Sequence, residues 1–297
     1  METELSKKVK KAIERIKLFE PDDGYYLAYS GGKDSDCIRI LADLANVKHE
    51  IHHNLTTVDA PETMQYIKSI PNVIIDKARY ADGRQKTMWS EILRNGTPPT
   101  RLMRYCCVSL KEVGGKGKLR MTGVRWAEST NRKHKADLVS IDRKQRTLKK
   151  VEAENAEYKE TKSVITLNDD NDTNRRVVEQ CYRTDRTIVN PIVDWSDEEV
   201  WEFLHSQGCE SNPLYKCGQT RIGCIGCPMK SGWGQKADFE RYPIYRANYI
   251  RAFDNMLKRR KEIGKVTSPE WTDGEAVMAW WVGDLKINKN KGKLNET

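Results

Sequence analysis

The chain has 297 residues, of which 38% are hydrophobic and 32% are charged, a balance typical of a water-soluble globular protein with one large or two small domains. It has no run of eighteen apolar residues and no apolar stretch over residues 1–8, so we expect neither a membrane span nor a signal peptide, but a cytoplasmic protein. The net charge of +9 suits an anionic partner, either a nucleotide alone or a nucleic acid as well.

Strands and helices alternate along roughly the first 133 residues. Hydrophobic periodicity predicts a helix over 3–19 and strands over 25–29, 49–55, 73–76 and 118–124, with helices beginning near 34, 61 and 88. Such alternation is typical of parallel strands joined by helices. The sequence therefore predicts an α/β fold with a doubly wound parallel sheet.

A polar stretch over 134–180 interrupts this alternation. We interpret it as an insertion with one or two β-hairpins and a mobile loop. After it, the pattern predicts a strand over 187–193 and a helix over 200–207. Residues 234–297 are predicted to be a basic, helical C-terminal region.

The sequence Ser-Gly-Gly-Lys-Asp-Ser, residues 30–35, joins the first predicted strand to a helix. Gly31 and Gly32 would let the main chain approach a phosphate closely, at a helix N-terminus that favours negative charge. Lys33 adds a positive charge, and Ser30 and Ser35 add hydroxyl donors. The spacing is not that of a Walker A loop. An anion-binding loop is the hypothesis, and a tight strand-to-helix turn is the alternative.

Further polar residues follow the second predicted strand. Thr57, Asp59 and Glu62 lie there, and Pro61 suits the first turn of the next helix. Because ligands of α/β sheets bind beyond the C-terminal ends of the strands, we expect these residues to face a nucleotide. A simple capped turn is the alternative.

Four of the eight cysteines form two pairs, Cys106-Cys107 and Cys224-Ile225-Gly226-Cys227, separated by 116 residues. Structural disulfides are rare in cytosolic proteins of this size. A Cys-x-x-Cys turn is a good chelate, whereas adjacent cysteines suit a cluster in which each thiolate binds a different iron. Spacing alone leaves three options open: an iron–sulfur cluster, zinc, and redox or structural thiols.

These motifs resemble a known family. Residues 30–35 are similar to the PP-loop of the N-type ATP pyrophosphatases, the adenine nucleotide alpha hydrolase-like proteins, which include the adenylylsulfate and phosphoadenylylsulfate (APS and PAPS) reductases. The resemblance covers roughly residues 24–230. It implies a PAPS reductase-like nucleotide-binding domain over 1–233, which includes the 134–180 insertion, followed by a helical extension over 234–297.

In that family the loop grips the phosphates of an adenine nucleotide, here ATP or APS/PAPS. The resemblance implies that an arginine-rich segment helps to hold the nucleotide's charged groups, because guanidinium binds phosphate or sulfate bidentately. Its residues here are Arg125, Glu128, Ser129 and Arg132. Lys33, Asp34 and Arg125 are the candidate catalytic residues, with Mg²⁺ expected if ATP is the substrate. Solvated residues on the first turns of a helix are the alternative for the arginine-rich segment.

The iron–sulfur branch of the family holds a 4Fe–4S cluster close to the nucleotide. It does so with a Cys-Cys pair and a later Cys-x-x-Cys. The resemblance therefore assigns such a cluster to Cys106, Cys107, Cys224 and Cys227.

One departure from the family bears on the reaction. The reductases attack the sulfate sulfur with a cysteine near the C-terminus, and here no cysteine follows Cys227. The leading hypothesis is therefore a PP-loop enzyme that acts at the α-phosphate in sulfur transfer or substrate adenylylation. One alternative is a thiol-dependent PAPS reductase that uses Cys217.

Another alternative is a non-catalytic nucleotide- or nucleic-acid-binding accessory protein. The basic segment 246–261 motivates it, although a solvated helix face is the commoner meaning of such a run. The expected partners are an adenine nucleotide and either a nucleic acid (DNA or tRNA) or a sulfur-transfer protein. The oligomeric state stays open, with a homodimer among the options.

Overall fold

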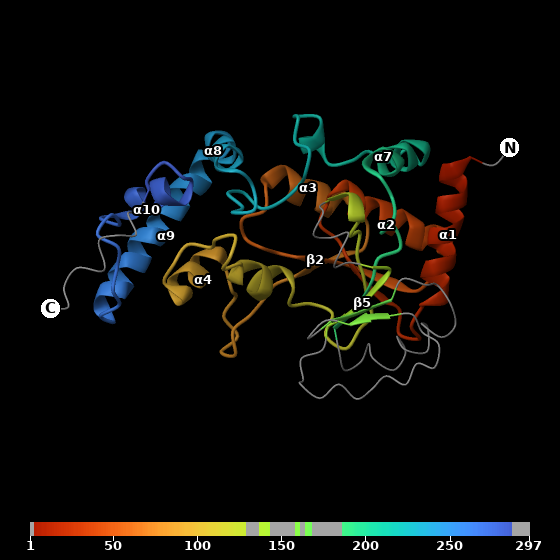
Figure 1. Cartoon of the computed structure of the whole chain (residues 1–297), viewed down its shortest axis with the longest axis horizontal. Coiled ribbons are helices and arrows are strands. Elements are labelled where there is room, and N and C mark those ends of the chain that lie inside the picture. Colours follow the sequence, from red (N-terminus) through yellow and green to blue (C-terminus); the bar gives the residue numbers. More distant parts are fainter. Residues whose placement is uncertain (1–2, 129–136, 143–157, 161–163, 168–185, 287–297) are drawn as a thin grey trace. The chain divides into compact units, whose positions relative to one another are not determined.

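The computed structural model describes residues 3–128, 137–142, 158–160, 164–167 and 186–286 (Figure 1). The chain divides into two compact units. The first comprises Met1–Asn54, Pro61–Asp76 and Gly114–Ile222, and the second comprises Leu55–Ala60, Lys77–Val113 and Gly223–Thr297. No helix within the described ranges has both the length and the apolar character needed to cross a membrane.

The first unit is built on one sheet, with the strand order β3-β2-β1-β4-β8-β5-β7-β6. Its strands are β1 (Tyr25–Ala28), β2 (His49–Asn54), β3 (Val73–Asp76), β4 (Arg120–Met121), β5 (Val139–Asp142), β6 (Tyr158–Glu160), β7 (Val164–Leu167) and β8 (Arg186–Val189). From β3 to β8 all neighbours in this order are parallel. The chain winds outward from β1 through β2 to β3, and then in the other direction through β4 to β8. This arrangement confirms the doubly wound parallel sheet.

The remaining strands form an antiparallel edge. β5 pairs with β8 and with β7, and β7 pairs with β6, all antiparallel. The hairpin pairing expected within the 134–180 insertion is therefore present in its described parts. The mobile loop predicted there falls outside the described residues.

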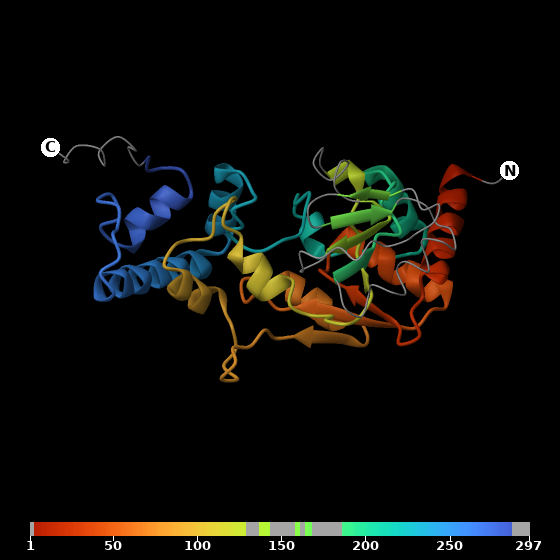
Figure 2. The same cartoon turned by 60° about the horizontal axis from the view of Figure 1, so that its bottom comes forward.

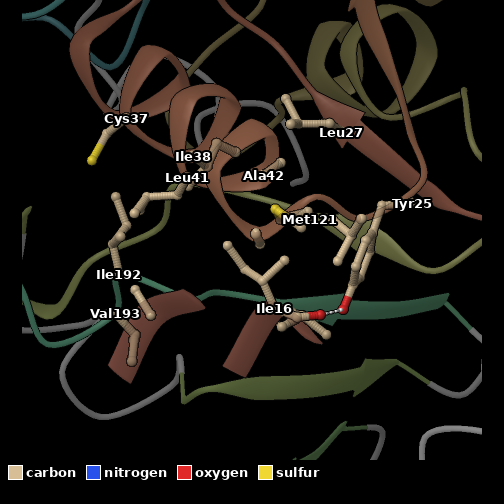
Figure 3. Packing of buried hydrophobic residues seen from close by; sticks show 14 of the residues in the cluster. Ile16, Tyr25, Leu27, Cys37, Ile38, Leu41, Ala42, Met121, Ile192 and Val193 are labelled. Atoms are coloured by element: carbon tan, nitrogen blue, oxygen red, sulfur yellow. Dashed lines mark hydrogen bonds between the residues drawn. The ribbon is translucent and has the colours of Figure 1, made fainter. Parts of the chain in front are cut away.

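Helices of the first unit bury their apolar faces against one another and the sheet. They are α1 (Glu4–Leu18), α2 (Lys33–Ala45), α3 (Pro61–Ser69) and α7 (Asp197–Ser206), with the 3₁₀ turns η2 (Trp126–Glu128) and η3 (Pro213–Tyr215). α1 lies beside α2 in both views (Figures 1 and 2). Figure 3 shows Leu41 of α2 and Ile192 within the core. There the Tyr25 hydroxyl donates a hydrogen bond of 2.8 Å to the Ile16 carbonyl.

Two strands are shorter than the sequence pattern predicts. β8 ends at Val189 because Pro191 has no N–H for the ladder and the chain turns there, fixed by the buried Asn190, whose amide donates to the Asp137 carbonyl at 2.8 Å. β4 ends at Met121, and Gly123 then packs against the backbone of Asp34, where a Cβ would lie 2.7 Å from the Asp34 carbonyl oxygen. This close approach brings the following segment to the start of α2.

The second unit is mainly helical. Its elements are α4 (Met88–Asn95), the π-helical turn η1 (Cys107–Lys111), α8 (Gly232–Arg241), α9 (Pro243–Glu262) and α10 (Gly274–Trp281). The long helix α9 packs along α4 and α10 (Figure 1). Tyr249, Phe253 and Trp281 form an aromatic cluster between α9 and α10, with ring centroids 4.8 to 6.0 Å apart.

Candidate functional site

In the first unit, residues 30–35 lie where β1 ends and α2 begins. Strand β1 is the strand from which the sheet winds in both directions, which is where α/β folds bind ligands. The Ser35 hydroxyl donates to the Gly32 carbonyl at 2.7 Å and accepts from the Gly32 N–H at 3.1 Å. These bonds fix the first turn of α2, whose dipole favours negative charge at this end.

Residues of α3 and the buried Asn212 pack against Gly31 of the loop. Gly31 has φ +71°, and a Cβ on it would lie 2.9 Å from Ile67 Cγ1 and 3.3 Å from Thr63 Cγ2. The buried Asn212 donates from its amide to the Gly31 carbonyl at 3.0 Å and to the Thr63 hydroxyl at 3.1 Å. Only glycine suits this position, since it combines a left-handed backbone with a close neighbour.

Two basic and two acidic side chains form a charge network at the start of α2. Lys33 is only 6% exposed, and its Nζ lies 3.2 Å from Asp197 Oδ1 and 3.5 Å from Asp34 Oδ2. The fully buried Arg125 donates through Nε to Asp34 at 2.7 Å and through another nitrogen to Asp197. Its third nitrogen donates to the Trp195 carbonyl at 3.1 Å.

The network favours the charged form of Asp197 and fixes the orientation of Asp34. Burial opposes ionisation of Asp197, but the hydrogen bond from Arg125 and the charge of Lys33 lower the pKa of its carboxyl below the usual value. All three nitrogens of Arg125 are bonded within the protein. Arg125 therefore positions Asp34, and Lys33 is the cation beside the loop.

Tyr215 in η3 also meets the loop. Its hydroxyl accepts a hydrogen bond of 2.9 Å from the N–H of Lys33, the first residue of α2. Burial raises the pKa of Tyr215, so its own O–H remains available as a donor. Asp197, Asn212 and Tyr215 were not among the residues predicted from sequence. The only signal for Asp197 was its place in the first turn of a capped helix.

Other expected site residues of the first unit have local roles. The Glu128 carboxylate accepts from the Arg125 N–H at 3.1 Å, and Glu62 lies in the first turn of α3 beside Thr63. Ser129 and Arg132 lie outside the described residues. The structure thus brings together the loop, Arg125 and Glu128.

The second unit contains all four paired cysteines, as well as Thr57 and Asp59. Cys106 and Cys107 lie at the start of η1, and Cys224 and Cys227 lie in a turn before α8. Two hydrogen bonds donated by main-chain N–H groups fix that turn: from Ile225 to the Val58 carbonyl at 2.8 Å and from Gly226 to the Asp238 carboxylate at 2.9 Å. The two pairs, 116 residues apart in the sequence, therefore lie in the same unit.

Electrostatic interaction links the thiols to one another and to Lys111. A side-chain hydrogen bond from Cys106 lowers the pKa of Cys107 to about 6, with Lys111 contributing, and the same bond raises the pKa of Cys106. Burial raises the pKa of Cys224 to about 11, against the effect of Lys111. Negative charge on Cys224 in turn raises the pKa of Lys111. These shifts make Cys107 easier to deprotonate than an ordinary thiol and make Cys106 and Cys224 harder to deprotonate.

Thr56 lies beside Cys224 in the second unit. The Thr56 hydroxyl lies 3.6 Å from the Cys224 sulfur, as a hydrogen-bond acceptor, and the Thr56 N–H donates to the Asp59 carboxylate at 2.8 Å. Thr57 has φ +67°, and its hydroxyl accepts from the Met88 N–H at 3.0 Å. Thr57 and Asp59 therefore belong structurally with the cysteines.

The four paired cysteines are candidate ligands for a metal centre. Within the described ranges, no three His, Cys, Asp or Glu side chains are grouped closely enough to hold one metal ion. Electrostatic interaction links Cys106 to Cys107, Cys224 and Cys227, and Lys111 acts on both Cys107 and Cys224.

Comparisons with known proteins identify the family whose motifs the sequence resembles. A family model described as the phosphoadenosine phosphosulfate reductase domain matches residues 24–230. The chain is similar to adenosine 5'-phosphosulfate reductase from Allochromatium vinosum, with 44% identity over 39 residues, which are 13% of this chain and 15% of that one. It is 29% identical to the enzyme of that name from Salinibacter ruber over 87 residues, 29% of each chain. The chain thus spans less than a third of the length of these relatives.

Among solved structures, the chain is similar to FMN adenylyltransferase from Candida glabrata in complex with FAD and inorganic pyrophosphate. The TM-score is 0.44 and the identity 11%, over 80% of this chain and 73% of that one. The same protein in complex with ATP gives a TM-score of 0.41 and 12% identity, over 75% and 62% of the two chains.

Proposed function

Because the chain belongs to the phosphoadenosine phosphosulfate reductase domain family, we propose that it is an enzyme that binds an adenine nucleotide at residues 30–35 and acts at its α-phosphate. The observation that carries this proposal is the network of Lys33, Asp34, Arg125 and Asp197 at the N-terminus of α2. A phosphate there would meet main-chain N–H groups and a preformed cation, which stabilise developing negative charge without reorganisation.

With ATP as substrate, each residue of the loop would have a defined task. An acceptor would attack the α-phosphorus, the bond to the bridging oxygen would break, and pyrophosphate would leave with the electron pair. Lys33 would offset the charge on the phosphates, and Asp34, held by Arg125, would bind Mg²⁺. The Tyr215 hydroxyl, next to the Lys33 N–H, would donate to a phosphate oxygen.

Binding and reaction type can be tested together. We expect ATP, APS or PAPS to raise the melting temperature of the protein, and Lys33→Ala to weaken binding of that nucleotide at least tenfold, since a charge-assisted contact contributes about 1.5–3 kcal/mol. Lys68→Ala, on the exposed side of α3, is the matched control and should bind like the parent protein. Equal affinity of the Lys33→Ala protein would contradict the assignment of the loop.

The reductase alternative rests on the position of Cys217. This exposed thiol lies two residues beyond Tyr215, in the turn that meets the loop. Release of sulfite from PAPS with thioredoxin, lost in Cys217→Ser, would favour the reductase. Release of pyrophosphate from ATP together with transfer of the AMP group to an acceptor would favour adenylylation.

We further propose that Cys106, Cys107, Cys224 and Cys227 hold a 4Fe–4S cluster. When bound, such a cluster supplies a redox-active or electrostatic centre for handling sulfur. The thiols must lose their protons to bind iron; the low pKa of Cys107 and the charge of Lys111 favour this for Cys107, and bound iron would favour it for the others.

Protein purified without oxygen should be brown and contain about four irons per chain. Cys107→Ser should lower the iron content and the visible absorbance. Cys209→Ser, which alters a partly buried thiol of the first unit, is the matched control and should leave both unchanged. A colourless protein with one zinc per chain would rule out the cluster.

A further inference from the structure

The charge of the chain is divided unevenly between the two units. The first unit contains 30 Lys and Arg and 30 Asp and Glu, whereas the second contains 22 and 13. The whole net charge of +9 therefore resides in the second unit. Positive charge concentrated on one part of a protein is the usual electrostatic mark of polyanion binding.

Part of this charge forms a row on α9. The buried face of the helix consists of Tyr249, Ala252, Phe253, Met256 and Arg260. Arg251 and Lys258, seven residues apart, lie on the opposite, exposed face, and Arg259 and Lys261 flank them. From Arg251 to Lys261 the row is about 15 Å long, at a rise of about 1.5 Å per residue.

The four basic side chains of this row are not neutralised. In the described part of the chain, none of Arg251, Lys258, Arg259 and Lys261 forms a salt bridge. Neighbouring basic residues do, since Lys230 binds Asp238 at 2.6 Å and Arg246 of α9 binds Glu275 at 2.7 Å. Cations in the last turn of α9 also interact favourably with the helix dipole, but Arg251 lies in the middle of the helix.

The row is separate from the cysteine site. Tyr249, on the buried face of α9, donates from its hydroxyl to the carbonyl of Ile225 in the Cys224 to Cys227 turn at 3.2 Å. The basic row faces away from this contact. Changes to the row should therefore leave the thiols as they are.

We propose that the row of Arg251, Lys258, Arg259 and Lys261 binds the phosphate backbone of a nucleic acid, independently of base sequence. When basic side chains contact the phosphates, the counterions condensed on the nucleic acid are released. The binding affinity therefore depends strongly on the salt concentration. The inference does not depend on the proposed chemistry at residues 30–35, because it rests on α9 alone.

The test is binding of the full chain to fluorescent 20-nucleotide probes, as single-stranded DNA, duplex DNA and single-stranded RNA, across a salt series. The row variant combines Arg251→Ala, Lys258→Ala, Arg259→Ala and Lys261→Ala. The matched control removes four exposed lysines of the first unit through Lys11→Ala, Lys17→Ala, Lys68→Ala and Lys116→Ala.

We expect the row variant to bind at least tenfold more weakly at 150 mM salt, and the slope of log affinity against log salt to become shallower by about three, as four lost phosphate contacts imply. The control should lose less than threefold. The preferred probe identifies the form of nucleic acid. The proposal would be overturned if both variants lost the same affinity or if the parent protein bound none of the probes. It would also be overturned if the parent protein bound poly-glutamate as tightly as nucleic acid. Thermal unfolding of both variants checks that each is folded.

Discussion

Replacing Arg125 by Met should destabilise the protein by about 3 kcal/mol and abolish nucleotide binding. Arg125 is fully buried and donates to Asp34, Asp197 and the Trp195 carbonyl, so its loss removes a hydrogen bond from each of these three acceptors and leaves Lys33 to face both carboxylates. Asp34 would then no longer be held beside Lys33, and two carboxylates would repel an incoming phosphate. Urea denaturation and nucleotide titration at a temperature where the variant is folded measure the two effects.

A second buried arginine separates stability from function. Arg15 also lies in the first unit, is 4% exposed, and binds Asp194 through two bonds of 2.9 and 3.0 Å and the Pro191 carbonyl at 2.9 Å. Arg15→Met should cost a similar free energy of unfolding and leave nucleotide affinity unchanged. The positioning role of Arg125 is refuted if both variants, or neither, lose the nucleotide.

The second large effect is expected from Gly31→Ala. The added methyl group meets Ile67 at 2.9 Å on a backbone with φ +71°. The left-handed conformation costs about 1–2 kcal/mol, and overpacking adds about 1–3 kcal/mol. The loop should shift away from Ile67, and nucleotide affinity should fall at least tenfold.

Gly208→Ala is the control for backbone strain. Gly208 has φ +62°, almost the same conformation, but nothing within 4 Å of an added Cβ. Its substitution should lower the free energy of unfolding by only about 1–2 kcal/mol and leave nucleotide affinity unchanged. Equal destabilisation by the two variants, with unchanged affinity in both, would mean that close packing behind Gly31 does not shape the loop.

The local parts of the site could be predicted from sequence. The apolar strand, the two glycines and the helix with its periodic apolar residues follow one another directly in the sequence. Each can be recognised from a few consecutive residues. β1, the loop and α2 therefore lie where the pattern placed them. The parallel sheet follows for the same reason, from repeated alternation of short elements.

The partners of the loop could not be predicted in the same way. Asp197, Asn212 and Tyr215 reach it from more than 160 residues farther along the chain, so only tertiary packing brings them there. Arg125 looked like a ligand for phosphate, because its residue type suits one. Its burial and its three internal hydrogen bonds depend on the close approach of Gly123 to the backbone of Asp34, a tertiary contact between residues far apart in the chain.

The most direct test of the central claim is an experimental structure of the protein with ATP or PAPS bound. We expect phosphate oxygens at the loop of residues 30–35, close to Lys33 Nζ, with Arg125 still bound to Asp34. An ordered nucleotide elsewhere, with the loop unoccupied and the Tyr215 hydroxyl still on the Lys33 N–H, would contradict it.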